Sequence, residues 1–247
     1  MGYYSDQIQD EVRLERMRPS QIETAVARRP AIYVPFGAME WHGYHNPVGL
    51  DSLKAHEQMV GLALHAGGVV YPPVYFGSGG GHGEWPHSYM VSEVAMTTIV
   101  SELLTGFARD GYESVIMVSG HYPNRGQYLD AGIAKFRESS DQVRILAILE
   151  NQVDGIDGDH AAKYETSSLM FLNPDTQDLS TLKDQHDVGG PSEKINWMDA
   201  SFDGHPCYGL VGIDPRRHAS REVGKDSSER LIARLTSWLD GEDFPKS

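Results

Sequence analysis

Four potential metal ligands lie within twelve residues of the chain: Glu40, His42, His45 and Asp51. If the backbone is extended there, Glu40 and His42 point the same way, because side chains repeat every two residues in extended backbone. Two glycines and a proline ahead of Asp51 allow a tight bend that would return its carboxylate to the same point. Carboxylates with imidazoles are ligands of Zn²⁺ and Mn²⁺, so the pattern predicts a divalent metal site. The alternative is a polar loop with incidental histidines.

Two later segments add candidates of the same type. His121 follows the apolar run 114–119 and precedes a predicted helix, so the alternative is a surface histidine that caps this helix. His160 and Glu165 lie five residues apart, ahead of the apolar run 169–172. Their alternative is the capped beginning of a helix, where a carboxylate is favourable.

The elements that would position these residues alternate between strand and helix. Apolar, β-branched runs predict strands at 31–36, 69–74, 114–119 and 143–149, and helical spacing predicts helices at 53–65, 92–109, 125–138 and 220–240. This alternation predicts an α/β fold with a mostly parallel central sheet covered on both faces. The carboxyl ends of parallel strands share one edge, where ligands bind, and all the candidate residues follow strands.

The chain reads as one unit. It has 247 residues, 40% of them hydrophobic, and no evident linker, so we expect a single domain over residues 1–247. Residues 173–206 are polar and weakly periodic, which predicts long loops with one short helix, serving as a lid or an assembly contact.

Composition excludes several classes of partner. The formal net charge is −14 and no Lys/Arg run occurs, so we expect neither a nucleic acid nor an anionic membrane as a partner, but a small-molecule substrate. Cys207 is the only cysteine, so no disulfide can form within the chain, and we interpret it as a small packing residue. No signal peptide and no apolar run near the ~18 residues of a membrane span is evident, which predicts a cytoplasmic protein.

The same residues carry a resemblance to a known family. The segment from Glu40 to Asp51 resembles the E-x-H-G-x-H-x-P-x-G-x-D motif of the creatininase (creatinine amidohydrolase) family at all seven fixed positions. The segment around His121 is similar to its G-H-x-x-N motif, and the segment from His160 to Ser167 to its H-x-x-x-x-E-T-S motif. The likeness runs in order from about residue 20 to about residue 240.

This resemblance implies a creatininase-like three-layer α/β sandwich and two divalent ions per subunit that share Asp51. One ion would take Glu40, Asp51 and His121, and the other would take His42, Asp51 and a further carboxylate. Zn²⁺ and Mn²⁺ suit such ligands, and Fe²⁺ is the third candidate. The resemblance also suggests a hexamer or another homo-oligomer.

One departure from the family pattern concerns a metal ligand. Creatininase carries the further carboxylate two residues after the histidine of G-H, where this chain has Pro123. Glu165 is the natural substitute as the fifth metal ligand. The departure argues against creatinine itself as the substrate.

The expected chemistry is attack on a carbonyl group. Two neighbouring ions can hold a bridging hydroxide at neutral pH and polarise the carbonyl. His160 is the expected catalytic proton carrier to the leaving nitrogen, because imidazole titrates near neutral pH. Five further side chains are candidate substrate contacts: His45, Trp41, His82, Glu84 and Tyr122. The alternative for each is a structural role, in packing, in a rigid loop or in orienting a metal ligand.

Three functions follow, in order of preference. The first is a dinuclear metal-dependent hydrolase of the creatininase type that opens the C–N bond of an amide or cyclic amide in a small polar molecule. The second is hydrolytic opening of a cyclic keto-sugar or keto-inositol at a C–C bond on the same dinuclear site. The third is a non-catalytic metal-binding protein.

Overall fold

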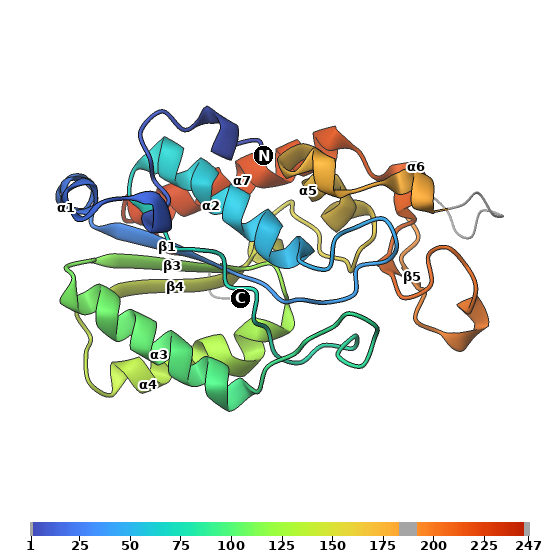
Figure 1. Ribbon diagram of the computed structural model, residues 1–247, viewed down its shortest axis with the longest axis horizontal. Coiled ribbons are helices and arrows are strands. Elements are labelled where there is room, and N and C mark those ends of the chain that lie inside the picture. Colours follow the sequence, from blue (N-terminus) through green and yellow to red (C-terminus); the bar gives the residue numbers. More distant parts are fainter. Residues whose placement is uncertain (1, 183–191, 245–247) are drawn as a thin grey trace.

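Four strands form the central sheet in a computed structural model that describes residues 2–182 and 192–244 (Figure 1). They are β1 (Ala31–Phe36), β2 (Val69–Val70), β3 (Ser114–Ser119) and β4 (Arg144–Leu149). The order across the sheet is β2-β1-β3-β4, and every pair is parallel. The predicted parallel central sheet is therefore confirmed.

Helices cover both faces of this sheet (Figure 1). On one face lie α2 (Leu50–Ala66) and α7 (Arg221–Leu239), with α5 (Lys163–Leu172) packed against both; on the other lie α3 (Glu93–Arg109) and α4 (Asp130–Arg137), the latter preceded by a π-helical turn at Arg125–Leu129. The remaining elements are α1 (Pro19–Arg28), α6 (Pro215–His218) and the antiparallel pair β5 (Ile195–Asn196) and β6 (Val211–Gly212). The arrangement is the three-layer α/β sandwich that was predicted.

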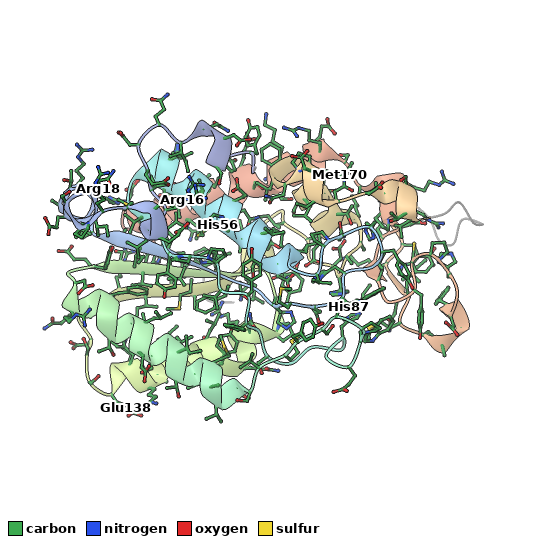
Figure 2. All side chains as sticks on the ribbon, in the orientation of Figure 1. Arg16, Arg18, His56, His87, Glu138 and Met170 are labelled. Carbon is green, nitrogen blue, oxygen red and sulfur yellow. The ribbon has the colours of Figure 1, made fainter. Side chains whose placement is uncertain are left out.

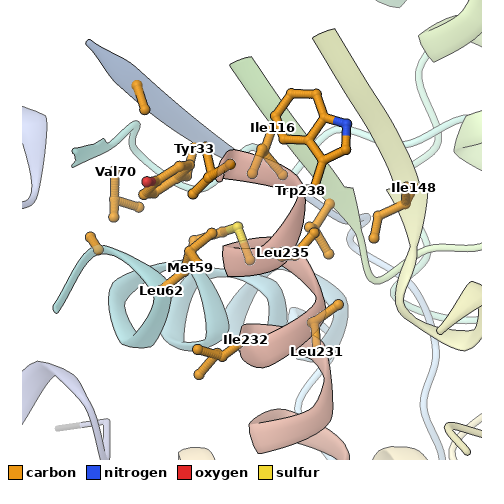
Figure 3. Close-up of a cluster of buried hydrophobic side chains, with 14 of the residues drawn as sticks. Tyr33, Met59, Leu62, Val70, Ile116, Ile148, Leu231, Ile232, Leu235 and Trp238 are labelled. Carbon is orange, nitrogen blue, oxygen red and sulfur yellow. The ribbon is translucent and has the colours of Figure 1, made fainter. Parts of the chain in front are cut away.

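Apolar side chains fill the space on each side of the sheet. On one side, Tyr33, Ile116 and Ile148 from three strands pack against Met59 of α2 and Leu235 of α7 (Figure 3). A second cluster joins the opposite face of the sheet to α3 and α4. Full burial of one such side chain contributes about 1.5–3 kcal/mol, so the two clusters hold the sheet rigidly between the helices.

The three longer strands end in step. Phe36 of β1 pairs with Ser119 of β3, and Ser119 pairs with Leu149 of β4. The residues that follow each strand therefore leave the sheet at one edge, as expected for a site at the carboxyl ends of parallel strands.

Close packing joins the end of β3 to the beginning of α2. An ideal Cβ atom on Gly120 would lie 2.4 Å from the main-chain oxygen of Asp51. No side chain fits there, so glycine at position 120 lets His121 and Asp51 approach each other through their backbones.

Some elements differ from the sequence-based expectation. The strand predicted at 69–74 ends at Val70, since Pro72 and Pro73 have no N–H to donate to a neighbour. Helix α2 begins at Leu50 rather than at residue 53, which puts Asp51 in its first turn. Helix α1 was not predicted, although Pro at its first position is typical of a helix start.

The long polar segment contains little regular structure. In its described parts it forms β5 and three 3₁₀ turns, at Pro174–Thr176, Leu179–Thr181 and Ala200–Phe202, in place of the one short helix that was predicted. Residues 183–191 of that prediction lie outside the described residues. Among the helices of residues 2–182 and 192–244, none is long and apolar enough to cross a membrane.

Candidate metal centre

The five predicted metal ligands converge at the carboxyl edge of the sheet. Glu40 follows β1, Asp51 begins α2, His121 follows β3 and Glu165 lies in the first turn of α5. Glu40 Oε2 and Asp51 Oδ2 lie 3.0 and 3.4 Å from His121 Nδ1. All five side chains are at least 97% buried, His42 included. Segments far apart in the sequence thus build one compact cluster.

Asp51 lies between two imidazoles. Its Oδ1 is 3.1 Å from His42 Nε2, while its Oδ2 faces His121 Nδ1. On the far side, His42 Nε2 lies 3.7 Å from Glu165 Oε2. One carboxylate therefore offers one oxygen to each of two neighbouring ligand groups, as a bridging ligand does.

The donor set fits divalent ions. His42 donates its Nδ1–H to the main-chain oxygen of Glu40, 2.9 Å away, which leaves Nε2 as the nitrogen that could bind a metal ion. That Nε2 and Asp51 Oδ2 are buried and have no hydrogen-bond partner among the residues that the structure describes. Buried polar atoms are almost always satisfied, so such unpaired atoms within one cluster mark a place for a cation. Glu40, Asp51 and His121 have ligand atoms close enough to hold one ion together.

Protonated His42 and His121 would balance the negative charge of the carboxylates in the cluster when no cation is bound. Burial alone would lower the pKa of His42 and of His121, but the surrounding carboxylates outweigh it and raise the two values to about 9 and about 10. Burial would raise the pKa of Asp51, but His42 and His121 hold it well below its usual value. The carboxylates are thus compensated by protons that a metal ion would replace.

His160 lies beside the cluster as a neutral imidazole. Its Nε2–H donates to the main-chain oxygen of Trp41 at 2.8 Å, and its Nδ1 faces Glu40 Oε2 at 3.9 Å. Its ring stacks between those of His82 and His42, at centroid distances of 3.8 and 4.6 Å. Burial, followed by the nearby His42 and His82, lowers the pKa of His160 well below its usual value. The fixed tautomer points a lone pair at the centre, where it can accept a proton or bind a metal.

A pocket of about 390 Å³ opens onto this cluster. Its lining residues are Glu40, Asp51, Gly80, Gly81, His82, Gly120, His121, Tyr122, Pro123, Asn151, Gly158, Asp159, His160, Glu165, Met198 and Val211. Two of the five predicted substrate contacts, His82 and Tyr122, are among them. The loop after β2 thus reaches the pocket with the backbone of Gly80 and Gly81 and with the His82 side chain.

The other three predicted substrate contacts are not among the lining residues. His45 is buried, with Nε2 2.9 Å from Thr166 Oγ1, so it connects the loop between β1 and α2 to α5. The Trp41 ring packs against Tyr44 and Trp85.

The third, Glu84, is exposed, and so is His87 in the same loop (Figure 2). The structure therefore does not bring Glu84 to the pocket.

Two charged residues of the centre escaped the sequence analysis. Asp159 lines the pocket and accepts hydrogen bonds from the main-chain N–H groups of Tyr164 and Glu165 at 2.7 and 3.1 Å. Asp159 lies ahead of Ala162, the N-cap of α5, and the signal for it is that a carboxylate is favourable near the beginning of a helix. Lys54, on α2, is completely buried and contacts Glu165 at 3.1 Å.

Fold and site together define a class of protein. It is an α/β/α sandwich with a buried cluster of carboxylates and imidazoles that can hold divalent ions, under a pocket at the carboxyl edge of the sheet. The family model for Creatininase, described as creatinine amidohydrolase, matches residues 15–239. The chain therefore belongs to the creatininase family, a family of hydrolases.

Relatives cover the chain to different extents. Creatinine amidohydrolase of Pseudomonas putida is 26% identical over 239 residues, covering 87% of this chain and 90% of that protein. A mycofactocin precursor peptide peptidase of Mycolicibacterium smegmatis is 27% identical over 169 residues, 64% of this chain and 66% of that protein. A 3-dehydro-scyllo-inosose hydrolase of Thermotoga maritima is 26% identical over 111 residues, 44% of this chain and 36% of that protein.

Solved structures share the fold. A crystal structure of creatininase matches with a TM-score of 0.78 at 22% identity, covering 97% of this chain and all 100% of that chain. A structure described as creatininase Mn matches with a TM-score of 0.77 at 22% identity, covering 96% of this chain and 100% of its own. A Zn–Zn form of a creatininase variant has the same TM-score of 0.77 at 23% identity, with the same coverage of 96% and 100%.

Proposed function

We propose that this protein is a dinuclear metal-dependent hydrolase that opens the C–N bond of an amide in a small polar molecule. The observation that carries the proposal is the position of Asp51, whose two oxygens face His42 and His121 separately. The Glu40–His121 position would hold one ion, with Glu40, Asp51 and His121 as ligands. The His42–Glu165 position would hold the other, with His42, Asp51 and Glu165.

Zn²⁺ and Mn²⁺ are the ions that the oxygen and nitrogen donors suit best, with Fe²⁺ as the third candidate. Creatininase structures described as Mn and Zn–Zn forms support this choice. When bound, such ions supply a hydroxide nucleophile at neutral pH and polarise a carbonyl oxygen.

The residues of the chain divide the remaining work. His160 Nδ1 can take up a proton and return it to a leaving nitrogen, because its Nε2 is already committed to Trp41. His82 is held in the same tautomer by the main-chain oxygen of Gly209, 2.6 Å from Nε2, so its Nδ1 can accept a hydrogen bond from a substrate. Both imidazoles are oriented before a substrate arrives, which avoids a reorganisation cost in the reaction.

The choice of a C–N bond rests on the relatives. Two of them are an amidohydrolase and a peptidase, and both names denote cleavage of such a bond. Pro123 in place of a carboxylate argues against creatinine itself. Ring opening of a keto-inositol or keto-sugar stays the second candidate, supported by the inosose hydrolase that matches 44% of the chain. A cytoplasmic location and a homo-oligomer, including a hexamer, stay predictions from the sequence.

Metal removal followed by a substrate screen tests the proposal. Protein stripped with a chelator and reloaded with Zn²⁺ or Mn²⁺ is assayed on cyclic amides and short peptides, and in parallel on cyclic polyol ketones. We expect hydrolysis in the amide series only, lost on stripping and restored by the ion. Turnover confined to the ketones would favour the second candidate, and stable metal binding without any turnover would favour the non-catalytic one.

A further inference from the structure

Lys54 is a buried cation at the back of the metal centre. Its side chain is 0% exposed, and its ammonium group lies between two carboxylates, 3.1 Å from Glu165 Oε1 and in close contact with Glu150 Oε1. Glu150 directly follows β4 and is itself 4% exposed. Its other oxygen accepts a hydrogen bond from Gln58 Nε2 at 2.9 Å. The three charges connect α2, β4 and α5 behind the site.

The two carboxylate oxygens of Glu165 have different partners. Oε1 is held by Lys54, and Oε2 accepts the main-chain N–H of Ala161 at 2.7 Å. Oε2 also faces His42 Nε2 at 3.7 Å. The carboxylate is thus fixed at both ends, and the oxygen that Lys54 does not hold is the one directed into the centre.

Helix geometry couples this cation to the bridging carboxylate. Asp51 and Lys54 are three residues apart on α2, so their side chains project from the same side of the helix one turn apart. A single rigid element therefore places Asp51 between the imidazoles and Lys54 against Glu165. Because position 123 is Pro123, the loop after β3 supplies no carboxylate to the centre. The further carboxylate is therefore Glu165 of α5, and its orientation has to be fixed.

Burial of the Lys54 ammonium group is unfavourable unless its partners compensate the charge. Removing a charge from water has a large energetic cost, and a buried ion pair recovers this cost only with good geometry on both partners. Without the ammonium group, Glu150 and Glu165 would be two buried carboxylates with no cation between them. Glu165 Oε1 would then have lost its partner, so the carboxylate would be free to turn toward another donor and away from the centre.

We propose that Lys54 is a positioning residue that holds Glu165 Oε1 and thereby directs Oε2 at the His42–Glu165 position. The inference rests on the proposed function, because it assigns a support to one ligand of the proposed dinuclear site. Lys54 is not among the residues that line the pocket, so it acts through Glu165 and not on the substrate. Its removal should affect one ion position and leave the Glu40–His121 position filled.

Zinc titration of metal-free Lys54→Met by calorimetry tests this separation. We expect the affinity of one of two Zn²⁺ ions to fall by about 10- to 100-fold, the usual effect of losing a group that supports a metal ligand, while the other is unchanged. Glu165→Gln should weaken the same ion, and the double variant should be no weaker than Glu165→Gln alone, because Lys54 acts through that carboxylate. Additive losses, or equal weakening of both ions, would overturn the inference.

Two variants control for damage to the buried network. Gln58→Leu removes a buried hydrogen bond to Glu150 without touching Glu165, and should bind both ions as the unmodified protein does. Glu150→Gln preserves the Lys54–Glu165 contact and should also retain both ions, which keeps the inference testable if Lys54→Met does not fold. Loss of the second ion from Glu150→Gln would show that the network as a whole, not Lys54, is required.

The titration separates failure of the inference from failure of the proposed function. If Lys54→Met binds two ions as tightly as the unmodified protein does, the proposed role of Lys54 is refuted, but the dinuclear site is not. A protein that binds fewer than two ions before any substitution would contradict the dinuclear site itself, and the inference with it.

Discussion

Replacing Asp51 with asparagine should reduce turnover by at least about 10³-fold and remove bound metal from both positions. Asparagine keeps the shape of the side chain but has one oxygen and one NH₂ group. It cannot offer an oxygen both to the ion beside His42 and to the ion beside His121. The substitution also removes one negative charge from the ligand set. Metal content after dialysis and turnover on the best substrate of the amide screen measure the two effects.

A matched control is Asp214→Asn. Asp214 is also a buried carboxylate, 6% exposed, but it caps α6 by accepting the main-chain N–H of Arg216 and is not among the pocket-lining residues. This variant should lose some stability and keep both ions and its turnover. If Asp51→Asn retained a full complement of metal, the bridging role would be refuted even if activity were lost.

Replacing His160 with glutamine should lower kcat by about 10²–10⁴-fold, the range for loss of a general acid–base group, with both ions retained. The imidazole faces the centre with a lone pair and lies in the pocket, but none of the proposed ion positions depends on it. Its ligand atom is also near those of Glu40 and His82, and near those of His42 and Glu165. Metal content therefore decides between a proton carrier and a ligand.

The comparison variant for His160 is His56→Gln. His56 lies on α2 outside the pocket (Figure 2), and burial lowers its pKa to about 4, so it is also a neutral, largely buried imidazole. We expect normal turnover and metal content from it. A fall in the metal content of His160→Gln, with kcat lowered only in proportion, would reassign His160 from proton transfer to metal binding.

Much of the fold follows from local patterns. The strands at Ala31–Phe36 and Ser114–Ser119 have the predicted bounds, because each is a short apolar run buried on both faces and bounded by a polar or turn-forming residue. Helix α7 also lies within one residue of its predicted ends, with Ser220 as its cap. For these elements the local sequence alone is enough to predict which residues are buried.

The elements that were missed depend on tertiary context. The beginning of helix α5 was considered only as the alternative for His160 and Glu165, and the structure does place Glu165 in its first turn. This helix carries buried polar residues, Glu165, Thr166 and Ser167 among them. This pattern hides the apolar periodicity of a helix. The pair β5 and β6 has two residues in each strand, too few for any alternation to be visible.

The clustering of the predicted metal ligands could be inferred from the sequence, but the residues that support them could not. Glu40, His42 and Asp51 are close in sequence, and the order of the strands brings His121 to the same edge. Lys54 reads as an ordinary polar residue of a helix, because its burial depends on partners from β4 and α5. Only the three-dimensional structure brings those partners together.

Calorimetric titration of the metal-free protein with Zn²⁺, in two buffers of different ionisation enthalpy, tests the dinuclear centre most directly. His42 and His121, with pKa values of about 9 and about 10, carry protons at pH 7 that metal binding must displace. We predict two bound ions, net proton release at pH 7, and affinity that rises with pH until these groups lose their protons between about 9 and 10. Binding of a single ion, or of two without proton release, would contradict the account.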